Sequence, residues 1–484
     1  MNSVVGSLAD PLESLPAIAA GLNPTYPPHK LNIMKTTRRN FLKKSSLLAF
    51  PAIIPASAIG ADGTTAPSNR ITMAAIGWGM QGPGNTGSFM NLPDVQVVAA
   101  CDLDKRHLEA AVNSINQKNG NSDCKSYKDY REVLARKDID TVMIAIPDHW
   151  HALVSIEAAK QGKDIYGEKP LARTIHEQQA IVKAVQQYKR IWQTGSWQRS
   201  NDNFRVGAEI VRNGLIGKVT EVHVGLPSGH ADFAGTKSKN QVTPPPAELD
   251  WEMWIGPSKM EDYIEGRVHK NWRWNYNTGG GQLLDWIGHH CDIAHWGLGC
   301  DEEGGPVEIE GKGEFPEPTA MWNTATKYRA EATYHNGVKV IIAGGHGDIQ
   351  SGTKWIGDKG WVHVDRGHFD CSNADFKKVI QQRQGDKVVD KTIHQELPDD
   401  LRKVQLIKTP RGHQGNFIDS VKSRERTITP VETAHHSAIP GHLALIAMIT
   451  GRKIKWDPAK EVIVGDEDAS KLLTREYRGP WKLA

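Results

Sequence analysis

The sequence predicts an α/β protein with a parallel, dinucleotide-binding sheet after an N-terminal leader and a region of hairpin strands farther on. From residue 70, short β-branched runs alternate with helical patterns, which is typical of parallel βαβ units. A glycine-rich turn directly follows the first run. Later, residues 330–343 contain an Asn336-Gly337 pair, and residues 354–364 contain a second turn at 357–360. Both segments predict β-hairpins.

The composition sets broad limits on function. The chain has 484 residues, of which 39% are hydrophobic and 24% charged, as in an ordinary globular protein of two or three domains. Lys and Arg number 59 and Asp and Glu 56, but the excess lies before residue 59, and the remainder carries a net charge of −1. This balance does not indicate nucleic acid or an anionic membrane as a partner. Five cysteines without a C-x-x-C pair indicate neither a disulfide scaffold nor a zinc site.

Residues 1–58 have the pattern of an export leader. Arg38-Arg39 precedes an apolar stretch at 47–59, which is too short to span a bilayer and contains the cleavage-type sequence Ala56-Ser57-Ala58. Paired arginines here resemble a twin-arginine signal, which would carry the folded protein to the periplasm with its cofactor. Met34 is an alternative start, and a basic amphipathic arm is the alternative reading. No other segment reaches about 18 uninterrupted apolar residues, so no membrane span is expected.

The glycine-rich turn predicts a phosphate-binding loop. It follows the strand expected at 71–76 and opens a helix, and its residues are Gly77, Trp78, Gly79, Met80, Gln81 and Gly82. In G-x-G-x-x-G the glycines allow a tight turn, close approach to a pyrophosphate and helix–strand packing. Asp102 ends the next strand, 20 residues after Gly82, where an acid binds an adenosine ribose and favours NAD over NADP. Lys105 and Arg106 keep NADP as an alternative, and a helix cap is the alternative role of Asp102.

Further candidate cofactor residues stand at later strand ends of this domain, which we place at 69–195. A strand expected at 141–146 is followed by polar residues, and a short strand at 164–166 leads into a Glu-Lys-Pro sequence. Ligands of an open α/β sheet bind at the carboxyl ends of its strands. The candidates are Pro147, Asp148, His151, Glu168 and Lys169.

Together, the glycine motif, Asp102 and Glu168-Lys169-Pro170 resemble the Gfo/Idh/MocA oxidoreductases. The resemblance strengthens over residues 279–292, which contain Asp285 and His289, and extends to residues 452–457. It implies that residues 196–484 form an α/β domain with an open, largely antiparallel sheet. Family members associate through this sheet, so a homo-oligomer, a dimer or tetramer, is expected.

The resemblance also implies a catalytic set. Lys169 is expected beside the nicotinamide, where its charge would stabilise an alkoxide. Asp285 and His289 are four residues apart and share one helix face, opposite the lysine. In the family these positions bind substrate and transfer the proton, which suits the titration of histidine near neutral pH. The alternative is a helix N-terminal acid beside a packed histidine.

The substrate candidates are side chains near this set. Trp197 and Arg199 follow the last expected Rossmann strand, and Arg273 lies in a tryptophan-rich region whose rings could stack on sugars. His290 is rotated by about 100° from His289 and could contact a flanking hydroxyl or simply pack. His413 is a further loop histidine that could reach the pocket. The spacing of His289, Asp292 and His295 is too loose to predict a metal site.

The expected function is an NAD(P)-dependent oxidoreductase acting on a hydroxyl or keto group of a sugar, polyol or glycoside. No soluble pool recharges NAD outside the cytoplasm, so the cofactor is expected to stay bound and be recycled in place. The alternative is an NAD-dependent glycosidase or lyase acting through a transient keto-sugar. A family branch that hydrolyses N-acetylgalactosaminides is similar, but it lacks the lysine present here as Lys169. A non-catalytic carbohydrate- or nucleotide-binding protein is the third possibility.

Overall fold

The computed structural model describes residues 69–231, 236–317, 320–374, 376–377, 381–384, 387–393 and 397–483. The leader, with Arg38, Arg39 and Met34, lies outside these residues, so the export signal and the alternative start stay predictions. No helix within the described ranges is long and apolar enough to cross a membrane.

The first part is a six-stranded sheet with strand order β3-β2-β1-β4-β5-β6, in which all neighbours are parallel. Its strands are β1 (Ile71–Ile76), β2 (Val95–Cys101), β3 (Lys125–Tyr127), β4 (Thr141–Ile144), β5 (Asp164–Gly167) and β6 (Trp192–Thr194). The chain leaves β1 in one direction along the sheet and returns to its other side at β4. Such a switch point opens a crevice at the carboxyl ends of the strands.

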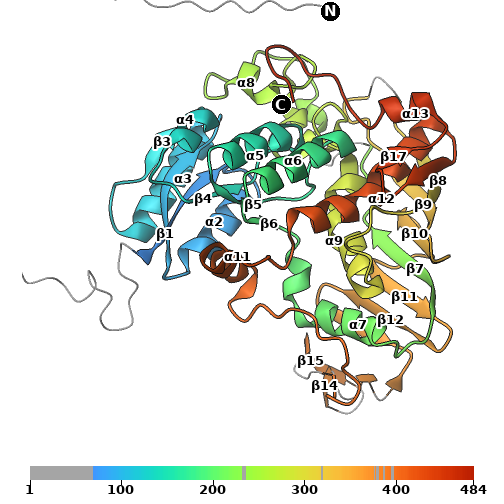
Figure 1. Ribbon diagram of the computed structural model, residues 1–484. Helices are drawn as coiled ribbons and strands as arrows, with labels where there is room; N and C mark the ends of the chain where they lie inside the picture. The colour runs from blue at the N-terminus through green and yellow to red at the C-terminus, as the bar shows by residue number, and fades with distance from the viewer. Residues whose placement is uncertain are drawn as a thin grey trace, which may run out of the picture. The chain divides into compact units, whose positions relative to one another are not determined.

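Helices cover both faces of this sheet because successive strand residues point to opposite sides. In β1, Ala74 and Ile76 join one core and Met73 and Ala75 join the other. The first core is completed by α5 (His151–Lys160) and α6 (Ile175–Gln187), and the second by α2 (Gly82–Met90), α3 (Lys105–Asn119) and α11 (Gly412–Ser423). The short α4 (Tyr130–Ala135) also belongs to this part (Figure 1). The predicted parallel domain is confirmed.

The second part is a nine-stranded sheet with strand order β13-β12-β11-β7-β10-β9-β8-β16-β17. Its strands are β7 (Val219–Leu226), β8 (Glu308–Glu314), β9 (Lys327–Thr333), β10 (Lys339–Gly344), β11 (Gly352–Gly357), β12 (Gly360–Asp365), β13 (His368–Cys371), β16 (Ile454–Asp457) and β17 (Val462–Ile463). Every pair is antiparallel except β7 with β10. The expected largely antiparallel sheet is therefore confirmed, with β9–β10 and β11–β12 as the two predicted hairpins.

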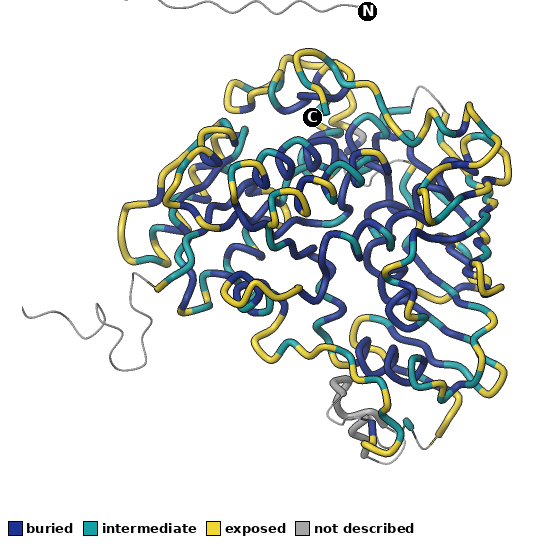
Figure 2. The backbone as a smooth tube through the Cα atoms, in the orientation of Figure 1, coloured by how far each residue is buried: buried dark blue, intermediate teal, exposed yellow. Residues whose placement is uncertain are grey.

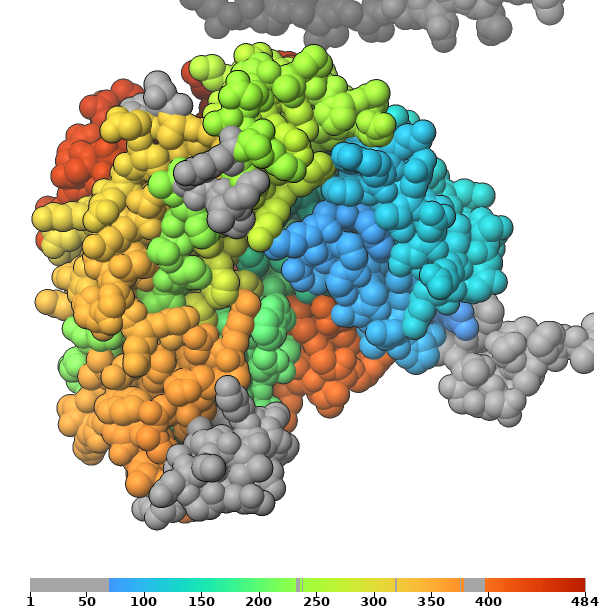
Figure 3. All heavy atoms as spheres, turned by 180° about the vertical axis from the view of Figure 1, so that it is seen from behind, coloured from blue at the N-terminus to red at the C-terminus, as the bar shows by residue number. Residues whose placement is uncertain are grey.

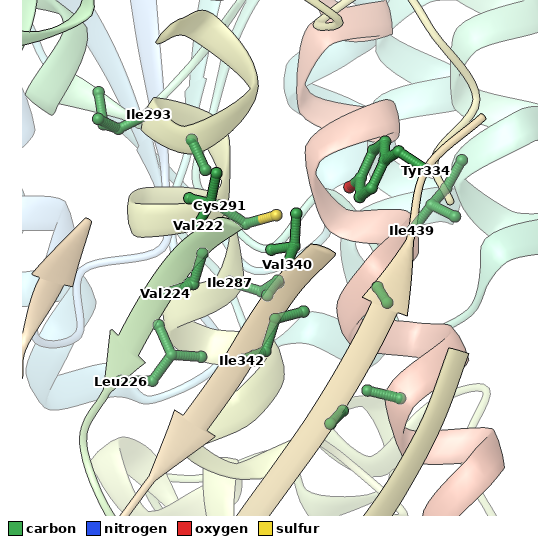
Figure 4. Packing of buried hydrophobic residues seen from close by; sticks show 14 of the residues in the cluster. Val222, Val224, Leu226, Ile287, Cys291, Ile293, Tyr334, Val340, Ile342 and Ile439 are labelled. Atoms are coloured by element: carbon green, nitrogen blue, oxygen red, sulfur yellow. The ribbon is translucent and has the colours of Figure 1, made fainter. Parts of the chain in front are cut away.

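Three helices pack on this sheet: α7 (Asp202–Arg212), α9 (Gly281–Leu298) and α12 (Val431–Thr450). Ile287 and Cys291 of α9 lie against Val222 of β7 and Val340 of β10 (Figure 4). Helix α12 is apolar on most of its surface, as a helix buried on several sides must be. Its first turns join the core of the Rossmann sheet and its later turns the core of the second sheet. The two parts thus share a helix. Figure 2 shows that the buried residues lie mainly where helices pack on the sheets.

Smaller elements complete the described chain. They are α8 (Trp251–Ile255), α13 (Glu467–Lys471), the strand pair β14 (Gln381–Gln384) and β15 (Lys387–Ile393), and 3-10 turns at Asp148–Trp150, Trp197–Ser200, Lys237–Lys239, Glu265–Arg267 and His269–Trp274.

Candidate active site

A cleft runs along the carboxyl ends of β1, β2, β4 and β5. One wall is formed by strand-end residues of the Rossmann part, among them Gly77, Asp102, Pro147 and Lys169. The opposite wall comes from the chain between β7 and α9, and its residues are Met253, Trp254, His269, Lys270, Trp272 and Arg273. Figure 3 shows the light green atoms of this second wall beside the blue Rossmann atoms.

The glycine turn has the geometry that its sequence predicts. Gly77 has φ +93°, and a Cβ there would lie 2.2 Å from the Ala145 carbonyl oxygen, so the turn requires glycine. A Cβ on Gly82 would lie 2.1 Å from the Gly77 oxygen. A Cβ on Gly79, by contrast, would meet nothing within 4 Å, because this glycine borders the cleft. The open space beside Gly79, at the N-terminus of α2, fits a pyrophosphate.

Asp102 stands at the end of β2 with both carboxylate oxygens held by the backbone. One oxygen accepts the Trp78 N–H at 2.7 Å and the other accepts the Asp104 N–H at 2.9 Å. The cap of α3 is Asp104, whose side chain accepts the Arg106 N–H, so Asp102 does not cap that helix. The side chain of Arg106 is also paired with Asp104. These contacts favour a ribose-binding role for Asp102, because the helix cap is Asp104 and Arg106 is paired with Asp104.

Lys169, Asp285 and Arg273 meet at the inner end of the cleft. The Lys169 Nζ donates to the Asp285 Oδ1 at 3.0 Å, and the Arg273 Nε donates to the same oxygen at 3.1 Å. Burial alone would raise the pKa of Asp285, but the two cations outweigh it and hold the pKa below its usual value. The ammonium group of Lys169 therefore faces an ionised carboxylate, from the second part of the chain.

His289 lies one turn after Asp285 on α9, with only 4% of its surface exposed. Among the residues that the structure describes, none is a hydrogen-bond partner of its Nδ1. Burial, together with Lys169 and Arg366, lowers the pKa of His289 well below the usual value. The imidazole is therefore neutral at pH 7 and able to accept a proton. Helix α9 is anchored here because the Ser196 hydroxyl donates to the Gly288 oxygen at 2.7 Å.

The predicted cofactor residues divide into those that line the cleft and those that lie behind it. The cleft is lined by Gly79, Met80, Gln81 and Glu168, and it is not lined by Trp78, Gly82, Asp148 and His151. The His151 ring nitrogens face the Pro170 and Ile146 carbonyl oxygens at 2.7 and 2.9 Å, so this side chain braces both strand ends. Burial, and secondarily Asp285, raises the pKa of Asp148 to about 7. Glu168 accepts a hydrogen bond from Asn85 of α2 at 2.7 Å.

The predicted substrate residues separate into two groups. Trp197 is half-buried beside Arg366, and Arg273 joins the catalytic cluster. Arg199, however, is 3% exposed and its guanidinium is bound to Asp292, at 2.8 Å from each carboxylate oxygen. The substrate role expected for Arg199 is therefore replaced by a structural one, because its donors are already occupied.

His290 and His413, the other two candidate histidines, are also buried. His290 stacks on Trp286 and lies 3.7 Å from an Asp365 oxygen, away from the cleft. The ring nitrogens of His413 face the Thr194 oxygen and the Ser200 hydroxyl, so it braces the fold. Asp104, His107 and His269 form the one metal-type cluster among the described residues, but Arg106 holds both oxygens of Asp104 and we assign no metal there.

Sequence reasoning missed two features of the site. Arg366 and Trp286 lie beside His289, yet Arg366 comes from the β12–β13 turn, where the sequence signals only a turn. Residues 248–274, which we call the roof segment, form the second wall of the cleft. The Lys105 N–H donates to the Glu248 oxygen at 2.9 Å, and the Trp150 indole donates to the Trp254 oxygen at 2.9 Å. In the sequence, only the run of tryptophans indicates that this segment forms part of the site.

The parallel sheet, the glycine turn and the strand-end acid define an NAD-binding Rossmann protein. The model of the oxidoreductase family with an NAD-binding Rossmann fold matches residues 71–196, and that of the family's C-terminal alpha/beta domain matches 201–392 and 369–483. The chain belongs to this family, the Gfo/Idh/MocA oxidoreductases.

Curated relatives match over shorter regions. A glycosyl hydrolase family 109 protein from Shewanella pealeana is 28% identical over 205 residues, which are 38% of this chain and 45% of that protein. An inositol 2-dehydrogenase from Salmonella paratyphi B is 31% identical over 150 residues, or 31% of this chain and 43% of that protein. The chain thus matches less than half the length of either relative.

Solved structures share the fold. A levoglucosan dehydrogenase in complex with NADH and levoglucosan superimposes with a TM-score of 0.56 at 16% identity, over 80% of this chain and 99% of that one.

Proposed function

We propose that this protein is an NAD-dependent oxidoreductase that acts on a secondary hydroxyl or keto group of a sugar, polyol or glycoside. The observation that carries the proposal is the contact of Lys169, which lines the inner end of the NAD cleft, with Asp285, one helical turn before the neutral His289. The names of an inositol dehydrogenase and a levoglucosan dehydrogenase among similar proteins support this substrate class.

Each of the three side chains has a separate role in oxidation. A bound nicotinamide supplies the hydride acceptor. His289 accepts the hydroxyl proton at its Nδ1, which is unprotonated at pH 7 and has no hydrogen-bond partner among the described residues. Lys169 stabilises the developing alkoxide with its ammonium group. Asp285, held by Lys169 and Arg273, orients the substrate hydroxyl and keeps the lysine in place.

We further propose that the cofactor stays bound between turnovers. The roof segment covers the adenosine half of the cleft, and the C-terminal tail, residues 472–483, fastens it from outside. Arg475 donates to Glu177 of α6 at 2.8 Å and to Ser258 of the roof segment at 3.2 Å. Arg478 donates to the Gly256 oxygen at 3.0 Å. A tightly held NAD fits a protein that works outside the cytoplasm.

The alternative is an NAD-dependent glycosidase or lyase, which the similarity to a glycosyl hydrolase family 109 protein favours. In that mechanism, oxidation acidifies the neighbouring carbon, elimination expels the aglycone and the hydride returns. The chemistry begins with the same proton and hydride transfers, which Asp285 and His289 would serve. Lys169 argues against this alternative, because the glycosidase branch lacks that lysine.

One experiment separates the two reactions. The purified full chain is tested for bound nicotinamide by absorbance and then incubated with sugars and with aryl glycosides. Persistent reduced nicotinamide identifies the dehydrogenase. Released aglycone with unchanged cofactor identifies the glycosidase. A protein that neither holds nor binds the nucleotide would contradict both.

Export and assembly are two further proposals. We expect the twin-arginine leader to direct the chain to the periplasm, and Arg38→Lys with Arg39→Lys to leave the precursor in the cytoplasm on cell fractionation. Export of the double variant at the normal rate would contradict this route. We expect a dimer or tetramer through the open face of the second sheet, as the family resemblance implies. A monomer in light scattering would contradict that assembly.

A further inference from the structure

The turn between β12 and β13 carries an arginine held between two aromatic rings. The Arg366 guanidinium lies 4.7 Å from the ring centroid of Trp197 and 4.5 Å from that of Trp286. Trp197 follows the last Rossmann strand, and Trp286 belongs to α9, next to Asp285. Three separate elements therefore converge to hold one cation.

This cation is adjacent to the catalytic cluster. The ring of Trp286 meets that of His289 edge-on, with centroids 5.5 Å apart. The positive charge of Arg366 helps to lower the pKa of His289, and Arg366 interacts electrostatically with the carboxylate of Asp285. A substrate in contact with His289 would thus lie beside Trp286, whose ring also contacts the exposed Arg366.

The guanidinium of Arg366 has no carboxylate partner among the residues that the structure describes. The backbone N–H of Arg366, and not its side chain, donates to the Asp365 Oδ1 at 2.7 Å. The other two cations of the cluster, Lys169 and Arg273, share Asp285. Within the described residues, the Arg366 guanidinium is thus a positive charge of this site whose hydrogen-bond donors remain available to a ligand.

A guanidinium is a planar fork of donors that matches the two oxygens of a carboxylate or phosphate. Contact with two tryptophan rings restricts the guanidinium and lowers the conformational cost of binding. Tryptophan rings also pack on the apolar faces of sugars. We propose that the substrate is an anionic sugar, and that Arg366 binds its carboxylate or phosphate oxygens while the sugar ring packs near Trp286. This inference rests on the proposed function and specifies its substrate class.

The test compares matched substrates that differ in charge. NAD-loaded full-length protein is assayed with methyl glucoside, methyl glucuronide and methyl glucoside 6-phosphate, in the wild type and in Arg366→Gln. We expect kcat/KM of the wild type to be about 10- to 100-fold higher for an anionic sugar than for the neutral one, the range that a charge-assisted hydrogen bond supplies. The glucuronide and phosphate arms show which anion is bound. In Arg366→Gln this ratio is expected to fall toward one, and Arg366→Lys is expected to recover part of it.

Two controls keep the result interpretable. Arg329→Gln removes an arginine of β9 that is paired with Asp348, outside this cluster, and should leave the ratio unchanged. Binding of the same three sugars is measured by isothermal titration calorimetry. Loss of anionic-sugar affinity in Arg366→Gln without any hydride transfer would support this inference while contradicting the proposed function. Equal kcat/KM and affinity for charged and neutral sugars in the wild type, or an unchanged ratio in Arg366→Gln, would overturn it.

Discussion

At the residue scale, Lys169 is the group on which the chemistry depends most. Lys169→Ala is expected to lower kcat by at least about 10²- to 10³-fold, because the alkoxide loses its cationic donor. NAD affinity should change little, since the phosphates and ribose are bound elsewhere in the cleft. Steady-state kinetics and nucleotide titration measure the two effects. The exposed Lys160 offers a control, Lys160→Ala. Loss of NAD binding with Lys169→Ala would show that its role is misassigned.

Asp102 determines the choice of nucleotide. Asp102→Ala is expected to weaken NAD binding by about 10- to 100-fold, because the ribose loses a charged acceptor. NADP binding should weaken less, because the carboxylate no longer repels its 2′-phosphate. Fluorescence titration with both nucleotides gives the ratio. An unchanged preference for NAD would contradict the ribose assignment.

Much of this residue-level account could be predicted because it rests on short motifs. Lys169 and Asp102 stand at strand ends whose positions follow from the chain pattern. Arg366 could not be found in this way, because its neighbours Trp197 and Trp286 lie more than 75 residues away along the chain. The neutral state of His289 depends first on burial and then on cations from other elements, which the sequence does not place near it.

At the scale of elements, the buried Arg199–Asp292 pair joins the turn after β6 to α9. Arg199→Ala is expected to lower the free energy of unfolding by about 3–5 kcal/mol, because it leaves Asp292 buried without a partner. Denaturant unfolding measures this loss. Replacing both residues by Met and Leu should restore part of the stability. A stable Arg199→Ala variant with altered sugar preference would indicate that Arg199 binds the substrate and has no structural role.

The C-terminal tail and the roof segment act as a clamp on the cofactor. Arg475→Ala combined with Arg478→Ala is expected to accelerate NAD release by about tenfold or more, since several hydrogen bonds that fasten the roof are lost. Stopped-flow displacement of bound nucleotide measures the rate. Lys471→Ala removes only an exposed pair with Asp468 and serves as control. An unchanged release rate in the double variant would show that the tail does not retain the cofactor.

The sequence predicted the elements unequally, for a physical reason. Strands β1 and β2 and both hairpins have local signals, namely β-branched runs and turn residues. The docking of the roof segment against α3 and the 3-10 turn at 148–150 depends on contacts between distant parts of the chain, such as Trp150 with Trp254. Periodicity carries no information about such contacts.

At the scale of the whole molecule, buried histidines make stability depend on pH. Burial lowers the pKa of His149, His295 and His442 to about 3 and that of His290 and His413 to about 4. The unfolded chain binds these protons near pH 6.5, whereas the folded chain does not. Their contribution to stability is therefore complete above about pH 6.5 and is lost as the pH falls toward 4.

We expect the free energy of unfolding to decrease over this pH range, with each such histidine contributing up to about 1.4 kcal/mol per pH unit. Denaturant titrations between pH 7 and 4 measure the slope. The exposed His176 provides a control, since His176→Gln should leave the slope unchanged. Stability that is constant or rises on acidification would contradict the buried, neutral state of these side chains.

The most direct test of the central claim is a single-turnover measurement of hydride transfer to the NAD held by the purified protein. A sugar deuterated at the reacting carbon is mixed with wild type and with Lys169→Ala, and nicotinamide absorbance and deuterium content are followed. The account predicts one equivalent of deuterated, reduced nicotinamide in the wild type and almost none in the variant. A sugar that binds both proteins while the nicotinamide stays oxidised and free of deuterium would contradict it.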